Sequence, residues 1–246
     1  MGGGAKGGGW RPRTLRRMTI AANLERVRSE VADACARAGR KPADVALMAV
    51  SKVHPAEALL EAYAAGQRLF GENRVQEAQG KAPLVRGLQG LELHLIGPLQ
   101  NNKTNKAAEI FDAVDTLDNA KTAGRLNAAA AALGRTLRVL VEVKLSHEES
   151  KHGLAPEALP GLLAELAGLG NLQVCGLMTV PPWSEDAETA RPYFQTLRRL
   201  REENAGEHPG LVELSMGMSG DFAVAIEEGS TCVRVGTAIF GRRVVA

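Results

Sequence analysis

The sequence predicts an α/β fold, a single (β/α)8 barrel of the TIM type. Short apolar runs of strand length alternate with amphipathic segments of helical length, and this alternation repeats eight times in about 220 residues. Most of the runs are apolar enough to be covered on both faces, which is typical of a parallel sheet flanked by helices. No GxGxxG follows the first run, which weakens the alternative of an open dinucleotide-binding sheet.

The elements follow in order along the chain. The segment 23–39 is expected to be a helix, with Leu24, Val27, Val31 and Ala34 on one face and Gly39 at its end. The predicted strands are 45–52, 68–73, 91–98, 112–118, 138–145, 172–180, 211–218 and 232–241, and 112–118 has the weakest pattern. The predicted helices are 55–66, a segment starting at Val75, 102–111, 119–134, 156–170, 187–204 and 221–229. Pro160 and Pro192 fall early in their helices, so those helix starts can shift by a turn.

Composition limits the function classes. Of the 246 residues 45% are hydrophobic and 24% are charged, and the net charge of +2 gives no argument for nucleic acid or a charged membrane surface. No apolar run reaches the ~18 residues of a membrane span. Residues 1–17 are glycine-rich and basic without an apolar core, so we expect a disordered extension before the barrel domain at 18–246.

The cysteines and histidines give no metal site. Three cysteines without a CxxC fit free thiols in a reducing compartment, so we expect a cytoplasmic protein. The sequence has no HExxH and no Cys/His cluster at zinc spacing. We interpret the two histidines of "HEESKH", at 147–152, as part of a solvated loop.

The turns after the last two strands have the composition of an anion site. In a barrel the functional groups follow the carboxyl ends of the strands, and phosphate is often held after strands seven and eight. "MGMSGDF" is a Gly/Ser-rich turn that leads into a helix, and "VGTA" offers further N–H groups and a hydroxyl. The alternative is that Ser219 or Asp221 only caps the helix and that Gly236 only turns the chain.

Lys52 and Arg234 complete the candidate site. Lys52 follows the first apolar run, where loss of solvation would favour a neutral, nucleophilic amine able to form a Schiff base; the alternative is a surface lysine whose stem lies along the rim. Arg234 lies two residues before Gly236 and, if it is buried, needs a hydrogen-bond acceptor. The alternative to a role in ligand binding is an ion pair with a barrel carboxylate such as Glu142. An amine, a phosphate cradle and an arginine between them describe a site for pyridoxal 5′-phosphate (PLP).

Five stretches carry a resemblance to a known family. "AVSKVHP", "AGQRLFGENRVQE", "HLIGPLQNNK", "GLMTV" and "LSMGMSGDFAVAIEEGSTCVRVGTAIFG" resemble, in order over about residues 23 to 242, the pyridoxal phosphate homeostasis protein family. The resemblance implies the fold of the alanine racemase N-terminal domain. It implies that Lys52 binds the cofactor, that Arg234 faces the pyridine nitrogen and that Asn73 lies near the cofactor. The phosphate contacts that it implies are Ser219, Gly236 and Thr237, with the Met218 backbone beside them.

The expected activity is storage or delivery of PLP rather than turnover. An arginine donates a hydrogen bond to the pyridine nitrogen without giving up a proton, which leaves the ring a weak electron sink. We also expect no second domain after the last strand that could supply an opposing acid or base. We therefore expect a non-enzymatic or at most vestigially active PLP-binding monomer, and the resemblance leaves open whether apo forms of PLP-dependent enzymes receive the cofactor. The alternatives are an amino-acid racemase and a lysine-dependent aldolase on the same barrel.

Overall fold

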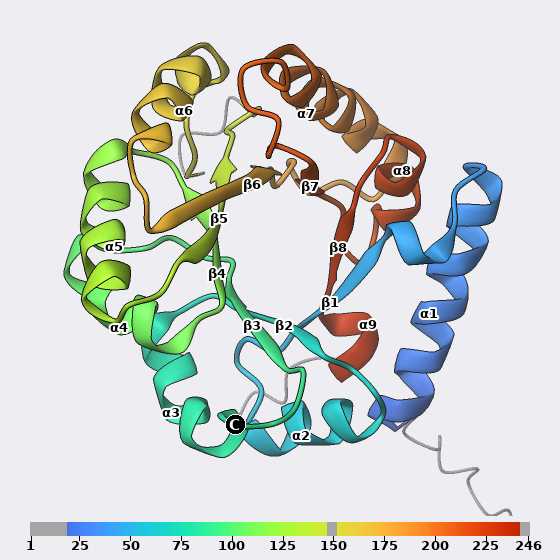
Figure 1. Ribbon diagram of the computed structural model, residues 1–246. Coiled ribbons are helices and arrows are strands. Elements are labelled where there is room, and N and C mark those ends of the chain that lie inside the picture. The colour runs from blue at the N-terminus through green and yellow to red at the C-terminus, as the bar shows by residue number, and fades with distance from the viewer. Residues whose placement is uncertain (1–18, 147–151, 242–246) are drawn as a thin grey trace, which may run out of the picture.

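The computed structural model describes residues 19–146 and 152–241. Within these ranges eight parallel strands form a closed barrel in sequence order, with β8 paired to β1 (Figure 1). The strands are β1 (Ala46–Val50), β2 (Leu69–Glu72), β3 (Glu92–Leu95), β4 (Ala113–Leu117), β5 (Leu137–Glu142), β6 (Leu172–Met178), β7 (Glu213–Ser215) and β8 (Cys232–Val235). The predicted barrel is confirmed, including the weakly patterned fourth strand. The predicted extension at 1–17 and most of the predicted loop at 147–152 lie outside the described residues.

Helices surround the barrel, as Figure 1 shows. They are α1 (Ile20–Arg37), α2 (Ala56–Ala64), α3 (Val75–Val85), α4 (Thr104–Ile110), α5 (Ala120–Ala132), α6 (Leu159–Ala167), α7 (Arg191–Asn204), α8 (Phe222–Glu227) and α9 (Thr237–Phe240). On α1 the buried side chains are Leu24, Val27, Val31, Ala34 and Cys35, so the predicted apolar face is confirmed. This face belongs to the apolar layer between helices and barrel, which also buries Phe70, Phe111 and Phe194 completely. None of the described helices is long and apolar enough to span a bilayer.

Several predicted boundaries were wrong. The predicted strand 211–218 is ordered as a strand only over Glu213–Ser215, because Gly217 takes a φ of +96° and turns the chain. The predicted strand 232–241 ends at Val235, and 237–240 form α9, whose Ile239 and Phe240 N–H groups donate to the Gly236 carbonyl. Two predicted helices begin with short 3-10 turns, Pro156–Ala158 and Ala187–Ala190, before α6 and α7; Pro160 and Pro192 lie in the first turns of those α-helices.

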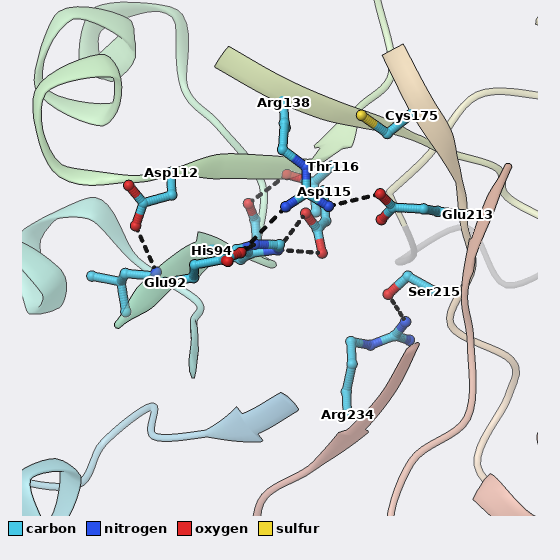
Figure 2. A network of polar contacts seen from close by, with 12 residues as sticks. Glu92, His94, Asp112, Asp115, Thr116, Arg138, Cys175, Glu213, Ser215 and Arg234 are labelled. Atoms are coloured by element: carbon cyan, nitrogen blue, oxygen red, sulfur yellow. Dashed lines mark hydrogen bonds and ion pairs between the residues drawn. The ribbon is translucent and has the colours of Figure 1, made fainter. Parts of the chain in front are cut away.

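The barrel interior is polar at the amino ends of the strands (Figure 2). His94 is 4% exposed, and its Nδ1 lies 3.1 Å from Asp115 Oδ1, while its Nε2 lies 3.7 Å from Glu92 Oε2. Arg138 lies between two carboxylates, with 3.2 Å to Glu92 and 2.7 Å to Glu213. These charges line a cavity of about 350 Å³ at the end of the barrel opposite Lys52. His94 and Asp115 are buried and need such partners, whereas the Arg138 and Glu92 side chains remain partly exposed.

His94 should make stability depend on pH. Burial disfavours its imidazolium, but the charge and hydrogen bond of Asp115, with Glu92, outweigh burial and raise the pKa from 6.5 to about 9. A group whose pKa is higher in the folded state stabilises the fold fully below its unfolded pKa and loses this contribution as pH rises through the folded value. We therefore expect the free energy of unfolding to fall by about 3 kcal/mol between pH 6.5 and pH 9.5 from this residue. Denaturant titrations of the wild-type protein and of His94→Gln over that pH range measure this change. The same pH dependence of the free energy of unfolding in both proteins would contradict the prediction.

Gly217 should be essential to the fold. A Cβ added there would lie 2.5 Å from the Ala225 Cβ and 3.0 Å from the Phe222 Cα, and the positive φ adds strain. We expect Gly217→Ala to lower the free energy of unfolding by about 2–4 kcal/mol. Gly220 in the same turn is the matched control, because a Cβ there meets nothing within 4 Å. Equal effects of the two substitutions in chemical denaturation would refute this account of the turn.

Candidate functional site

A cavity of about 380 Å³ opens at the carboxyl ends of the strands. All seven residues predicted for the site line it: Lys52, Asn73, Met218, Ser219, Arg234, Gly236 and Thr237. They follow or end four strands (β1, β2, β7 and β8), and barrel closure makes β8 the neighbour of β1. The volume lies in the range of small-molecule sites. The fold therefore brings the predicted amine, arginine and turns to one place.

Lys52 lies in the turn that follows β1. Ser51, just before it, is fully buried, and its N–H donates to the Gly71 carbonyl of β2 at 3.0 Å. Lys52 itself is half-buried and is one of the residues that line the cavity. A half-buried amine at a cavity wall can reach a carbonyl group held inside.

Two turns form a further part of the wall. Ser219 and Gly220 are exposed in the turn before α8, and Gly236 and Thr237 begin α9. The Met218 N–H donates to Asp221 Oδ1 at 2.5 Å, so that N–H is already bound within the protein. Asp221 is the residue before α8, and its side chain makes no capping hydrogen bond to that helix. Burial raises the pKa of Asp221, while its hydrogen bond to Met218 opposes the shift. Asp221 thus shapes the turn rather than capping the helix.

Arg234 is a buried cation at the floor of the cavity, with 4% of its surface exposed. Its Nη1 donates to Ser215 Oγ at 2.7 Å, as Figure 2 shows, and its Nη2 donates to the Thr179 carbonyl at 2.8 Å. These partners, rather than an ion pair with Glu142, hold the guanidinium. Burial lowers the pKa of Arg234, and nearby acidic groups oppose that shift. Two of its donors are therefore engaged at known positions, which fixes the direction of the guanidinium plane.

Asn73 is placed by close backbone packing. It follows β2 and lines the cavity, and its carbonyl oxygen would lie 2.2 Å from a Cβ added to Gly97. Glycine at 97 therefore lets the two loops after β2 and β3 approach each other. The Ile96 N–H extends the ladder by donating to the Glu72 carbonyl at 2.9 Å.

The sequence did not identify one wall of the cavity. The segment after β6 contributes eight lining residues: Val180, Pro182, Trp183, Ser184, Asp186, Ala187, Thr189 and Ala190. Trp183 is 80% exposed. In the sequence, a tryptophan after two prolines and before a predicted helix was the signal that could have pointed to this loop. Ser215 and Thr179, which hold Arg234, were also missed as site residues. Both sit at the carboxyl ends of their strands, so strand position alone could have suggested them.

A second cavity of about 200 Å³ adjoins the first and shares Ile96 and Val180 with it. The residues that line it include Glu142, Lys144, Ser146 and His152. Burial raises the pKa of Glu142 to about 7, against the opposing effect of the Arg234 charge. Among the described residues no cluster of acidic, histidine or cysteine side chains has the geometry of a metal site.

Comparisons with known proteins identify the family of this chain. The family model described as "Alanine racemase, N-terminal domain" matches residues 21–244. The pyridoxal phosphate homeostasis protein of Pseudomonas aeruginosa is 47% identical over 225 residues, covering 92% of this chain and 96% of that protein. The protein of the same name from Vibrio cholerae is 44% identical over 228 residues, covering 92% of this chain and 97% of that protein.

Solved structures show the same fold. PipY of Synechococcus elongatus, a structure with PLP bound, is 42% identical with a TM-score of 0.81, covering 91% of this chain and 100% of that one. Alanine racemase of Clostridium difficile shares the fold at 15% identity and a TM-score of 0.70, covering 92% of this chain and 60% of that one. The chain thus belongs to the pyridoxal phosphate homeostasis protein family, built on the alanine racemase N-terminal domain fold.

Proposed function

We propose that this protein binds PLP in the cavity at the carboxyl ends of the strands and holds it through a Schiff base on Lys52, as part of intracellular PLP homeostasis. One observation carries the proposal: an amine, a buried cation and two turns rich in small residues all line one cavity of about 380 Å³. The PLP-bound relative, 42% identical, supports the choice of ligand. When bound, PLP supplies an aldehyde that condenses with amines and an electron-withdrawing ring.

The residues of this chain fit the phosphate, the ring nitrogen and the aldehyde of PLP. The turns at Ser219–Gly220 and Gly236–Thr237 present backbone N–H groups and hydroxyls suited to a phosphate. Arg234, fixed by Ser215 and Thr179, presents a permanent cation to the ring nitrogen. Lys52 supplies the amine: its nitrogen bonds to the aldehyde carbon, and the carbonyl oxygen leaves as water.

Holding and releasing PLP fits this site better than turnover. A guanidinium donates a hydrogen bond to the ring nitrogen but does not protonate it, so the ring gains little capacity to stabilise a carbanion. The relatives from Pseudomonas aeruginosa and Vibrio cholerae are named homeostasis proteins. We propose that this carrier acts as a monomer in the cytoplasm and that apo forms of PLP-dependent enzymes are candidate recipients.

Borohydride reduction tests the attachment point. Incubation with PLP, reduction and peptide mass analysis should place the pyridoxyl group on the peptide containing Lys52. Lys52→Ala should abolish this modification and leave the unfolding temperature within a few degrees, because a half-buried rim amine adds little to packing. Modification of another lysine in the wild-type protein, with Lys52 unmodified, would refute the assignment.

Exchange of α-protons separates the carrier from a racemase. The PLP-loaded protein, incubated with several amino acids in deuterated buffer, should show α-proton exchange slower by about 10³-fold or more than an ordinary enzymatic turnover of about 10 s⁻¹. NMR of the amino acids measures this, and PLP in buffer alone gives the background. Sustained exchange at an enzymatic rate would establish the racemase-like alternative.

A further inference from the structure

The turn that carries Lys52 has an unfavourable backbone conformation. The His54 N–H donates to the Ser51 carbonyl at 3.1 Å, so Lys52 and Val53 are the two central residues of the turn. Val53 has a φ of +60°, the one non-glycine residue with a positive φ in the described part of the chain. A β-branched residue in this region is strained and persists only where its surroundings enforce it. Something must therefore hold this turn.

Helix α3 contacts the turn on both sides of Lys52. Glu77 Oε2 accepts the Val53 N–H at 3.1 Å, and Lys81 Nζ donates to the Ser51 carbonyl at 2.8 Å. Glu77 and Lys81 are four residues apart, so both side chains extend from the same face of the helix. One rigid element thus binds the backbone immediately before and immediately after Lys52.

Lys81 is itself fixed by a buried ion pair. Its Nζ lies 2.6 Å from Glu72 Oε1, which also accepts the Ser51 hydroxyl at 2.6 Å. Glu72 is fully buried and Lys81 is 8% exposed. A buried pair of this kind is weak evidence for net stability, but it specifies geometry because either charge left unpaired is costly. The Ser51 hydroxyl is therefore held by Glu72, and the Ser51 carbonyl is held by Lys81 of α3.

The other side of the turn rests on the helix that begins at the second turn of the cavity wall. The His54 ring stacks on Phe240 of α9, with ring centroids 5.1 Å apart and an interplanar angle of 30°. α9 starts at Thr237, directly after Gly236. The Lys52 turn is thus bracketed between α3 and the element that carries part of the proposed phosphate site.

We propose that Glu77 and Lys81 are positioning residues that hold the Lys52 turn in its strained form, so that the amine is directed into the cavity before ligand arrives. This inference rests on the proposed role of Lys52. Holding the turn in advance removes the ordering cost that a loose loop would add to imine formation. Glu77 fixes the peptide that joins Lys52 to Val53, and Lys81 fixes the residue on which the turn begins.

Substitution of Glu77 gives the first test. We expect Glu77→Ala to slow the second-order reaction with PLP, followed by absorbance, by about tenfold, because one charge-assisted hydrogen bond is lost. Glu77→Gln keeps an acceptor oxygen and should stay within about threefold of wild type. Glu57→Ala, which removes an exposed carboxylate in the first turn of α2, is the control and should react like wild type.

A readout without PLP separates this inference from the proposed function. In the ligand-free protein, Glu77→Ala should speed hydrogen exchange in the peptide covering Val53 and leave the strand peptides unchanged. If borohydride marks Lys52 but Glu77→Ala reacts with PLP at the wild-type rate, the positioning role is overturned while the function stands. Equal slowing by the Ala and Gln variants would also overturn it.

Removal of the strain provides an independent check. Glycine adopts a positive φ without penalty, so a Val53→Gly protein needs Glu77 less to keep the turn. Adding Glu77→Ala to Val53→Gly should change the PLP reaction rate by less than about threefold, against about tenfold in the valine background. The same tenfold loss in both backgrounds would show that Glu77 acts by another route than by holding Val53.

Discussion

Pairing of the last strand with the first is the constraint on which the site depends. β8 pairs with β1 in parallel, and the register sets Met48 beside Arg234 and Ala49 beside Val235. The turns that follow these strands therefore meet, although about 180 residues of sequence separate them. Gly236 approaches the β1 backbone so closely that an added Cβ would lie 3.2 Å from the Val50 carbonyl oxygen. This contact therefore sets how closely the lysine turn and the last turn lie beside each other.

The interior of the barrel divides into two polar ends with different roles. At the amino ends of the strands, Arg138 is neutralised by Glu92 and Glu213, and His94 by Asp115. At the carboxyl ends, Arg234 donates to a hydroxyl and a carbonyl, which are neutral groups, while Asp115, Glu142 and Asp221 act on its charge without sharing those hydrogen bonds. A cation with neutral hydrogen-bond partners attracts an electron-rich ligand atom more strongly than a cation paired directly with carboxylates. This contrast supports the proposed ligand site at the carboxyl ends.

The sequence was sufficient for what depends on periodicity and strand order. The eight strands and the α1 face followed from apolar runs. Lys52, Arg234 and the turns at Ser219 and Gly236–Thr237 followed from their positions near the strand ends, whereas Asn73 and Met218 were expected only from the family resemblance. What it did not reveal depends on contacts between distant segments. The Arg234 partners, the His94–Asp115 pair and the wall near Trp183 come from side chains whose meeting depends on barrel register. The early end of β7 and the helix at 237–240 follow from glycine conformations that local pattern does not report.

The closing strand also orders events in time. During synthesis the segment with Lys52 leaves the ribosome early, but residues 232–237 emerge last among the parts of the site. Until β8 inserts between β1 and β7, a nascent barrel lacks the Arg234 guanidinium and the turn at Gly236–Thr237. The proposed ligand site is therefore complete only once the barrel has closed.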